Sequence, residues 1–189
     1  MKKVSVFMTA LLLSATTYAQ TWTVDKAHAK LGFTVTHMMV SDVDGMFKDF
    51  DASFTASKPD FSDAVFNVTA QTNSIYTDNE KRDAHLKSAD FFDAEKNPTI
   101  TFKSKSMKKA GNNAYKVSGD LTMHGVTKPV VLDLTFRGPA THPMTKKQFA
   151  GFSISGKVKR TDFNIGSSMP GAVISDEVTI SAKGEFQQG

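Results

Sequence analysis

Five histidines are the side chains best suited to metal binding or acid–base chemistry in this sequence. They are His28, His37, His85, His124 and His142. A catalytic zinc site of the H-E-x-x-H type needs two histidines on neighbouring turns of one helix, and no such pair is present. His28 and His37 are nine residues apart, so on one continuous strand they would face opposite sides. The histidines therefore favour turn or core positions, and we expect no metal site.

Nucleophilic catalysis has little support either. The sequence has no cysteine, which excludes disulfides, thiol catalysis and thiolate metal ligands. The G-x-S-x-G motif, which places a nucleophilic serine on a tight strand-to-helix turn, is absent. Ser167 and Ser168 fall in an expected loop with no base beside them. Carboxylates that pair only in space are invisible in a sequence. A hydrolase or isomerase that uses His and Asp residues at the mouth of the fold is therefore the alternative to a binding protein.

The first nineteen residues have the pattern of a secretory signal peptide. Lys2 and Lys3 precede an apolar run, 4–13, and small residues end the segment at Ala19. The apolar run is too short to span a bilayer. Cleavage after Ala19 would leave 189 − 19 = 170 residues, which suits one domain, 20–189, and would change the net charge from +4 to +2. That charge is too small to indicate a nucleic-acid partner.

Apolar and polar residues alternate with a period of two through most of the mature chain, which predicts β-strands. The exception is the polar segment 78–88, which opens with Asp78 and reads as one short helix. The eight expected strands cover residues 29–39, 46–56, 64–72, a segment from 99 onward, 115–123, 126–138, 148–161 and 172–186.

A sheet with one apolar face must bury that face, and the expected helix is too short and too polar to cover it. Closing the sheet on itself buries the face and removes the exposed edges. We therefore predict an all-β fold, an eight-stranded antiparallel barrel with one short helix inserted between strands. A two-sheet sandwich is the alternative. Strands of about twelve residues would give a barrel about 30 Å tall, wide enough inside for side chains or one small ligand.

Phenylalanine is the dominant aromatic residue, with 15 Phe against 3 Tyr and 1 Trp. Phe has no polar tip, so it suits both a core and the wall of an apolar pocket. Burying ten carbons of a ligand tail at ~0.8 kcal/mol each would supply about 8 kcal/mol. We expect a binding protein with the following tail contacts, all placed by alternation: Phe33, Phe50, Phe54, Phe102, Leu132, Leu134, Phe136, Phe152 and Ile154. Arg82, His85 and His124 are the expected contacts of a polar or anionic head group. A barrel that its own side chains fill, with no ligand, is a further alternative.

Five sequence blocks carry a resemblance to a known family. They are WTVDKAHAKLGFTVTH from Trp22, VDGMFKDF from Val43, RDAHLKSADFFDAEKNPTITFKS from Arg82, GDLTMHGVTKPV from Gly119 and KRTDFN from Lys159. In this order they resemble the motifs of the YceI-like family over nearly all of the mature chain. Two residues depart from the family pattern: Ala29 replaces a more typical Ser, and Asn164 replaces the usual Gly.

The resemblance implies a periplasmic, lipocalin-like barrel that holds a long apolar molecule, such as a polyprenyl chain or an isoprenoid quinone. It implies no agreed catalytic residues and no cofactor besides such a bound lipid. It also allows a homodimer and a role in stress response. No nucleic-acid partner and no stable membrane anchor are expected.

Overall fold

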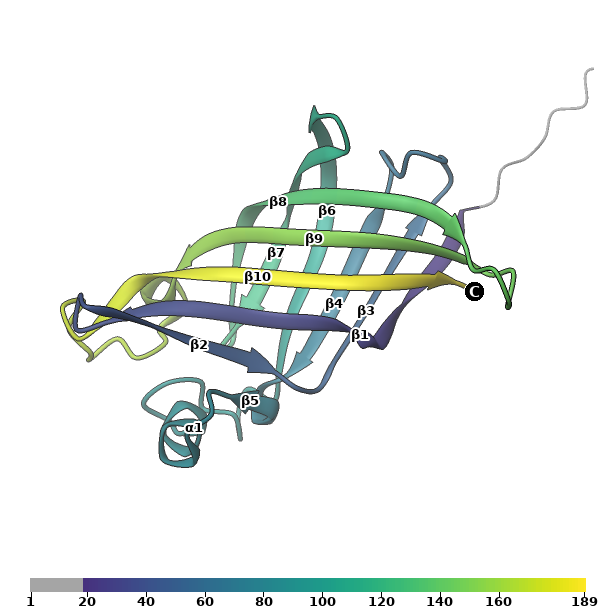
Figure 1. Ribbon diagram of the computed structural model, residues 1–189. Helices are drawn as coiled ribbons and strands as arrows, with labels where there is room; N and C mark the ends of the chain where they lie inside the picture. Colours follow the sequence, from purple (N-terminus) through teal and green to yellow (C-terminus); the bar gives the residue numbers. More distant parts are fainter. Residues whose placement is uncertain (1–18) are drawn as a thin grey trace, which may run out of the picture.

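The computed structural model describes residues 19–189, which form a barrel of strands with one helix at its edge (Figure 1). The predicted signal peptide lies outside the described residues, apart from Ala19. The strands are β1 Gln20–His37, β2 Ser41–Phe47, β3 Phe50–Ala56, β4 Val65–Gln71, β5 Ile75–Tyr76, β6 Thr99–Gly111, β7 Ala114–Met123, β8 Val126–Thr141, β9 Gln148–Lys159 and β10 Ile174–Gln188. The helix is α1 Glu80–Lys87, and two 3₁₀ turns cover Thr72–Ser74 and Arg160–Phe163.

Eight antiparallel strands close the barrel, as predicted. They follow the order β10-β9-β8-β7-β6-β4-β3-β1, and β1 pairs with β10 to complete the ring. Strands β2 and β5 lie outside this ring, because β2 pairs with the second half of β1 and β5 pairs with β2. No helix among residues 19–189 has the length and apolar character needed to cross a membrane.

Strand β1 explains the two largest differences from the predicted strand bounds. Its first half pairs with β3 over Gln20–Thr23, and its second half pairs with β2 over Leu31–His37. Because β1 changes partner in this way, the predicted strand 46–56 is two strands, with Lys48 and Asp49 between them. The sequence pattern also placed the start of β1 too late, at residue 29, because a bulge interrupts the alternation there.

The bulge lies between Asp25 and Lys30, where four residues of β1 stand opposite the single residue Gly184 of β10. The Asp25 carboxylate stabilises the shape of this bulge. It accepts a hydrogen bond from the backbone N–H of Ala27 at 3.0 Å and lies 2.7 Å from Nδ1 of His28. The D-x-x-H spacing of the first sequence block therefore forms a local turn inside a strand.

Helix α1 is where the sequence predicted it, but its cap is different. Asn79, not Asp78, is the N-cap residue, and its side chain accepts from the backbone N–H of Arg82 at 3.0 Å. Asp78 instead accepts from the hydroxyl of Tyr76 at 2.8 Å. Buried Asp83 anchors the helix to the chain before it by accepting from the backbone N–H of Thr77 at 2.8 Å.

Aromatic rings fill one end of the barrel. Trp22 stacks on Phe54 with ring centroids 5.4 Å apart, and Phe61 meets both rings edge-on. Phe61 also lies 4.7 Å from Phe136, and Phe54 lies 5.0 Å from Phe152. Close-packed large rings leave no room for a guest at this end.

Candidate functional site

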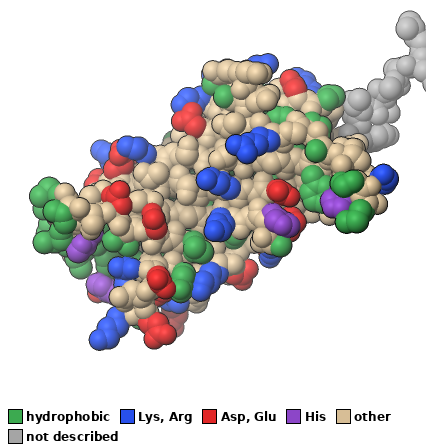
Figure 2. All heavy atoms as spheres, in the orientation of Figure 1, with side chains coloured by type: hydrophobic (Ala, Val, Ile, Leu, Met, Phe, Trp, Pro, Cys, Tyr) green, Lys and Arg blue, Asp and Glu red, His purple; other side chains and the backbone are tan. Residues whose placement is uncertain are grey.

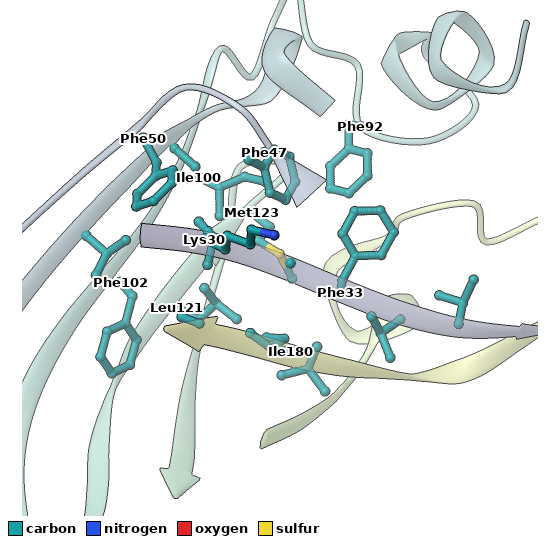
Figure 3. A pocket seen from close by; sticks show the side chains of 18 of the residues that line it. Lys30, Phe33, Phe47, Phe50, Phe92, Ile100, Phe102, Leu121, Met123 and Ile180 are labelled. Carbon is teal, nitrogen blue, oxygen red and sulfur yellow. The ribbon is translucent and has the colours of Figure 1, made fainter. Parts of the chain in front are cut away.

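The other part of the barrel interior is hollow. A cavity of about 590 Å³ lies between the strands, and its wall is almost entirely aromatic and aliphatic (Figure 3). Every strand of the ring, together with β2 and α1, contributes side chains to this wall. Such a volume falls within the usual range for small-molecule sites.

Three phenylalanines build one side of the cavity. The Phe33 ring lies 5.9 Å from that of Phe47, which meets Phe92 edge-on at 6.1 Å. Phe33 occupies this position because residue 45 of β2 is a glycine: a Cβ there would lie 2.2 Å from Cζ of Phe33. The glycine of the V-x-G-x-F block is therefore needed by the ring that rests on it.

A second group of rings forms the floor. Phe66, Phe152 and Phe186 line the cavity on one side and pack into the filled end on the other. Phe152 lies 5.1 Å from Phe66 and 5.6 Å from Phe186. The sequence left open whether the phenylalanines form a core or a cavity wall. They form both, a solid core at one end of the barrel and a cavity wall at the other.

Eight of the twelve residues expected at the site line the cavity. These are Phe33, Phe50, Phe102, Leu132, Phe152, Ile154, Arg82 and His85.

The remaining four lie elsewhere. Phe54, Leu134 and Phe136 point into the barrel, as alternation predicts, but they belong to the filled end. His124 sits in the β7–β8 turn with a positive φ of 49°, and its Nδ1 lies 3.1 Å from the carbonyl oxygen of Phe163. Alternation tells which face a side chain takes, but it does not tell its height along the barrel.

Every ionisable side chain that lines the cavity within residues 19–189 is basic. The set is Lys30, His37, Lys81, Arg82, His85, Arg160 and Lys183. Lys30 is labelled in Figure 3 among the residues that line the cavity, and it is exposed to solvent. A wall with basic groups and no carboxylate favours an electronegative or anionic group on a ligand.

Arg160 is the exception among these cations, because the protein itself uses all of its donors. A guanidinium has five N–H donors. The five backbone carbonyls that accept from Arg160 are those of Ser175, Ile165, Gly166, Met169 and Ile174. Arg160 is 4 % exposed and holds the loop 164–173 against the barrel, so it is a positioning residue.

Arg82 and His85 are more accessible. Arg82 donates from Nε to the Thr77 hydroxyl at 2.8 Å and from Nη2 to the Thr77 carbonyl at 2.6 Å. Three of its five donors have no partner among residues 19–189. His85 meets Phe91 edge-on at 4.9 Å, and its Nε2 lies 3.3 Å from a carboxylate oxygen of Asp90. Both side chains can turn toward a ligand at the cavity rim.

The structure also brings three ionisable side chains into a cluster that the sequence did not predict. Asp25, His28 and Glu185 place one potential ligand atom each within 4.8 Å of one another, on the bulge of β1 and the facing part of β10. The hydrogen bond between His28 and Asp25 raises the pKa of the His28 imidazole and lowers the pKa of the Asp25 carboxyl. The D-x-x-H spacing signalled the first two, but Glu185 joins them only through the β1–β10 pairing. None of the three lines the cavity.

A closed antiparallel barrel around an apolar cavity defines a class of protein, the small barrels that enclose one apolar ligand. Within that class, residues 22–186 match the model of the YceI-like domain. The chain therefore belongs to the YceI-like family.

Similar proteins agree with this assignment. The chain is 39 % identical to Protein YceI of Salmonella agona over 184 residues, which cover 96 % of this chain and 95 % of that protein. The crystal structure of the Campylobacter jejuni YceI protein is 35 % identical and has a TM-score of 0.75, covering 82 % of this chain and 90 % of the other.

Two further solved structures share the barrel. BcnA of Burkholderia cenocepacia superposes with a TM-score of 0.77 at 25 % identity, covering 86 % of this chain and 98 % of BcnA. A polyisoprenoid binding domain from Saccharophagus degradans has a TM-score of 0.67 at 15 % identity, covering 91 % of this chain and all of that domain. The second of these likenesses concerns the fold alone.

Proposed function

We propose that this protein binds and carries an amphiphile whose long apolar tail, a polyprenyl or similar chain, lies in the barrel cavity. The observation that carries the proposal is the cavity of about 590 Å³ whose wall is apolar except for basic groups. Transfer of apolar surface from water to such a wall is the main source of affinity for a tail. The polyisoprenoid binding domain with the same fold supports this choice of ligand class.

The tail contacts in this proposal are the residues from the sequence analysis that line the cavity, together with Phe47, Phe92, Met123 and Ile180. The head group lies at the rim near α1, where Arg82 and His85 offer hydrogen-bond donors. We propose a carrier rather than an enzyme. Export to the periplasm is part of the proposal and is supported by the signal-peptide pattern of residues 1–19.

The test is the lipid content of the exported protein. Organic extraction followed by mass spectrometry is expected to release one long-chain amphiphile per protein molecule. Ile154→Asp places a carboxylate in the cavity wall and is expected to abolish this content. The matched control is Val131→Asp on the outer face of the barrel, where Val131 is 59 % exposed, and it is expected to retain the lipid.

A second variant separates loss of ligand from loss of fold. Ala182→Phe adds a ring in the empty space of the cavity, so the protein is expected to lose the lipid while its unfolding temperature without lipid is at least as high as that of the delipidated parent. Protein that carries no lipid in any preparation overturns the proposal. An activity that is lost in His85→Ala, in protein free of lipid, would establish the enzyme alternative instead.

A further inference from the structure

An exposed apolar turn stands at one end of the barrel. The turn between β1 and β2 carries Met38, Met39 and Val40, whose exposed fractions are 51 %, 75 % and 83 %. Figure 2 shows hydrophobic side chains gathered at the end of the molecule where Figure 1 places this turn. Three consecutive large apolar residues at a solvent-facing tip are an unfavourable arrangement in water.

A second loop broadens this apolar tip. The backbone N–H of Met38 donates to the carbonyl of Val173 at 2.9 Å, which fastens the turn to the segment before β10. Pro170 and Ala172 are exposed beside it. We call the residues Met38–Val40 together with Pro170–Ala172 the apolar lip.

The two segments that form the apolar lip carry no Lys, Arg, Asp or Glu. This holds for residues 37–41 and for residues 163–175, although 22 % of the chain is charged. Two loops at the opposite end of the barrel differ, since residues 57–64 and 142–147 both contain charged side chains. The lip segments are therefore longer uncharged stretches than these two loops offer.

The apolar lip is continuous with the cavity. His37, Met169 and Ile174, which flank the two lip segments in the chain, line the cavity wall. On the other side of the same mouth, α1 contributes Lys81 and Arg82 to the lining. The mouth thus has an apolar edge without charged residues and an edge where Lys81 and Arg82 face the cavity.

These two edges match the two layers of a bilayer surface, acyl chains below and phosphates above. Resting on the proposed function, we propose that the apolar lip docks this end of the barrel onto the surface of a lipid bilayer that contains anionic lipids. The lip enters the boundary between head groups and acyl chains while α1 faces the phosphates. A bound amphiphile then passes between bilayer and cavity without crossing water.

A lipid surface fits the lip better than a protein partner does. A stable protein interface takes about 20–30 residues a side. The apolar lip has six residues, whereas shallow insertion into a bilayer needs only a few apolar side chains beside basic groups.

The test is flotation of the full exported chain with vesicles of equal parts phosphatidylcholine and phosphatidylglycerol. The parent protein is expected to float with the vesicles. The double substitution Met39→Asp and Val40→Asp is expected to reduce flotation by at least about tenfold, because it puts two charges where the lip enters the bilayer. The control is Met144→Asp in the β8–β9 loop at the opposite end, where Met144 is 82 % exposed, and it is expected to float like the parent.

The lip variant also separates docking from tail binding. When the extracted amphiphile is added back from an organic stock, the lip variant is expected to take it up as the parent does. Flotation of the lip variant equal to that of the parent overturns the docking proposal. So does a parent that stays in solution although extraction finds its lipid, and in that case the carrier proposal stands. A dimer that the lip substitutions break, with no flotation of the parent, would assign the lip to a second copy.

Discussion

Arg160 shows how a charged side chain lines an apolar cavity without offering itself to a ligand. Its guanidinium is buried and donates to five backbone carbonyls, so its charge is solvated by peptide dipoles rather than by a carboxylate. Asn164 follows the same turn with a φ of 58°, a left-handed conformation that Asn tolerates better than most residues. This explains how Asn stands where relatives are expected to have Gly.

We predict that Arg160→Leu lowers the free energy of unfolding by about 2–4 kcal/mol, because it leaves several buried carbonyls without a donor. The control is Arg137→Leu at an exposed position of β8, where a change within about 0.5 kcal/mol is expected. Urea denaturation of both variants measures the difference. Equal effects of the two substitutions would contradict the positioning role of Arg160.

The pair of Asp25 and His28 gives the bulge of β1 a dependence on pH. The hydrogen bond to Asp25 raises the pKa of His28, so the stability from this shift is present below pH 6.5 and is lost as the pH rises through the folded value. The same bond lowers the pKa of Asp25, so that contribution is present above pH 3.8 and is lost as the pH falls through the folded value. The pair therefore stabilises the bulge most between about pH 3.8 and pH 6.5.

We predict that the His28 imidazole titrates above 6.5 in the folded protein and that Asp25→Asn moves its pKa down toward that value. NMR titration of the ring protons measures both. The reason is that the amide cannot supply the negative charge that favours the imidazolium. A His28 pKa that is the same in both proteins would show that the carboxylate does not act on the ring.

Two close contacts, each between a glycine on one strand and a phenylalanine ring on the neighbouring strand, help to determine the shape of the cavity. Gly45 leaves room for the Phe33 ring, and Gly119 of β7 leaves room for the Phe102 ring of β6, since a Cβ on residue 119 would lie 2.7 Å from that ring. A ring on one strand and a glycine on its neighbour fill the space of two ordinary side chains. The arrangement places both rings in the cavity wall.

We predict that Gly45→Ala destabilises the protein by about 1–3 kcal/mol, because the new methyl group overlaps the Phe33 ring. Adding Phe33→Leu is expected to restore part of the loss, and thermal unfolding of the four proteins of the double-mutant cycle measures the coupling. The control is Gly171→Ala, since nothing lies within 4 Å of a Cβ there. Additive effects of the two substitutions would mean that the ring does not rest on Gly45.

The barrel combines a solid end and a hollow end in one closed sheet. The aromatic cluster around Phe54 supplies stability without a ligand, while the cavity leaves apolar wall that only a guest can cover. A ligand that binds the folded state alone must raise its stability by mass action.

From the proposed function we predict that extraction of the lipid lowers the unfolding temperature and that adding it back restores the original value. Ligand at a hundred times its dissociation constant contributes about 2.7 kcal/mol, which corresponds to roughly 5–10 °C for a domain of this size. Calorimetry of extracted, refilled and untreated protein measures the shift. The filled variant Ala182→Phe serves as the control, because its unfolding temperature is expected not to respond to lipid.

Much of the fold could be predicted because a strand in a barrel has one solvent-facing side and one side that faces the apolar interior. The alternation of Leu132, Leu134 and Phe136 with polar neighbours assigned those side chains to the interior, and all three are buried there. The eight strands of the closed ring follow from the same pattern, and the short helix follows from the one long break in it. The split of residues 46–56 into two strands did not, because it results from β1 changing partners.

The candidate site could be predicted in part, for the same reason. The alternation of apolar and polar residues along a strand predicts which side chains face the barrel interior, because it depends only on neighbouring residues in the chain. The depth of each ring, and with it the boundary between solid core and cavity, depends on how eight strands are staggered around the ring. That stagger brings Glu185 to His28 and separates Phe54 from Phe33, because contacts between distant strands are set by packing and closure rather than by nearest neighbours.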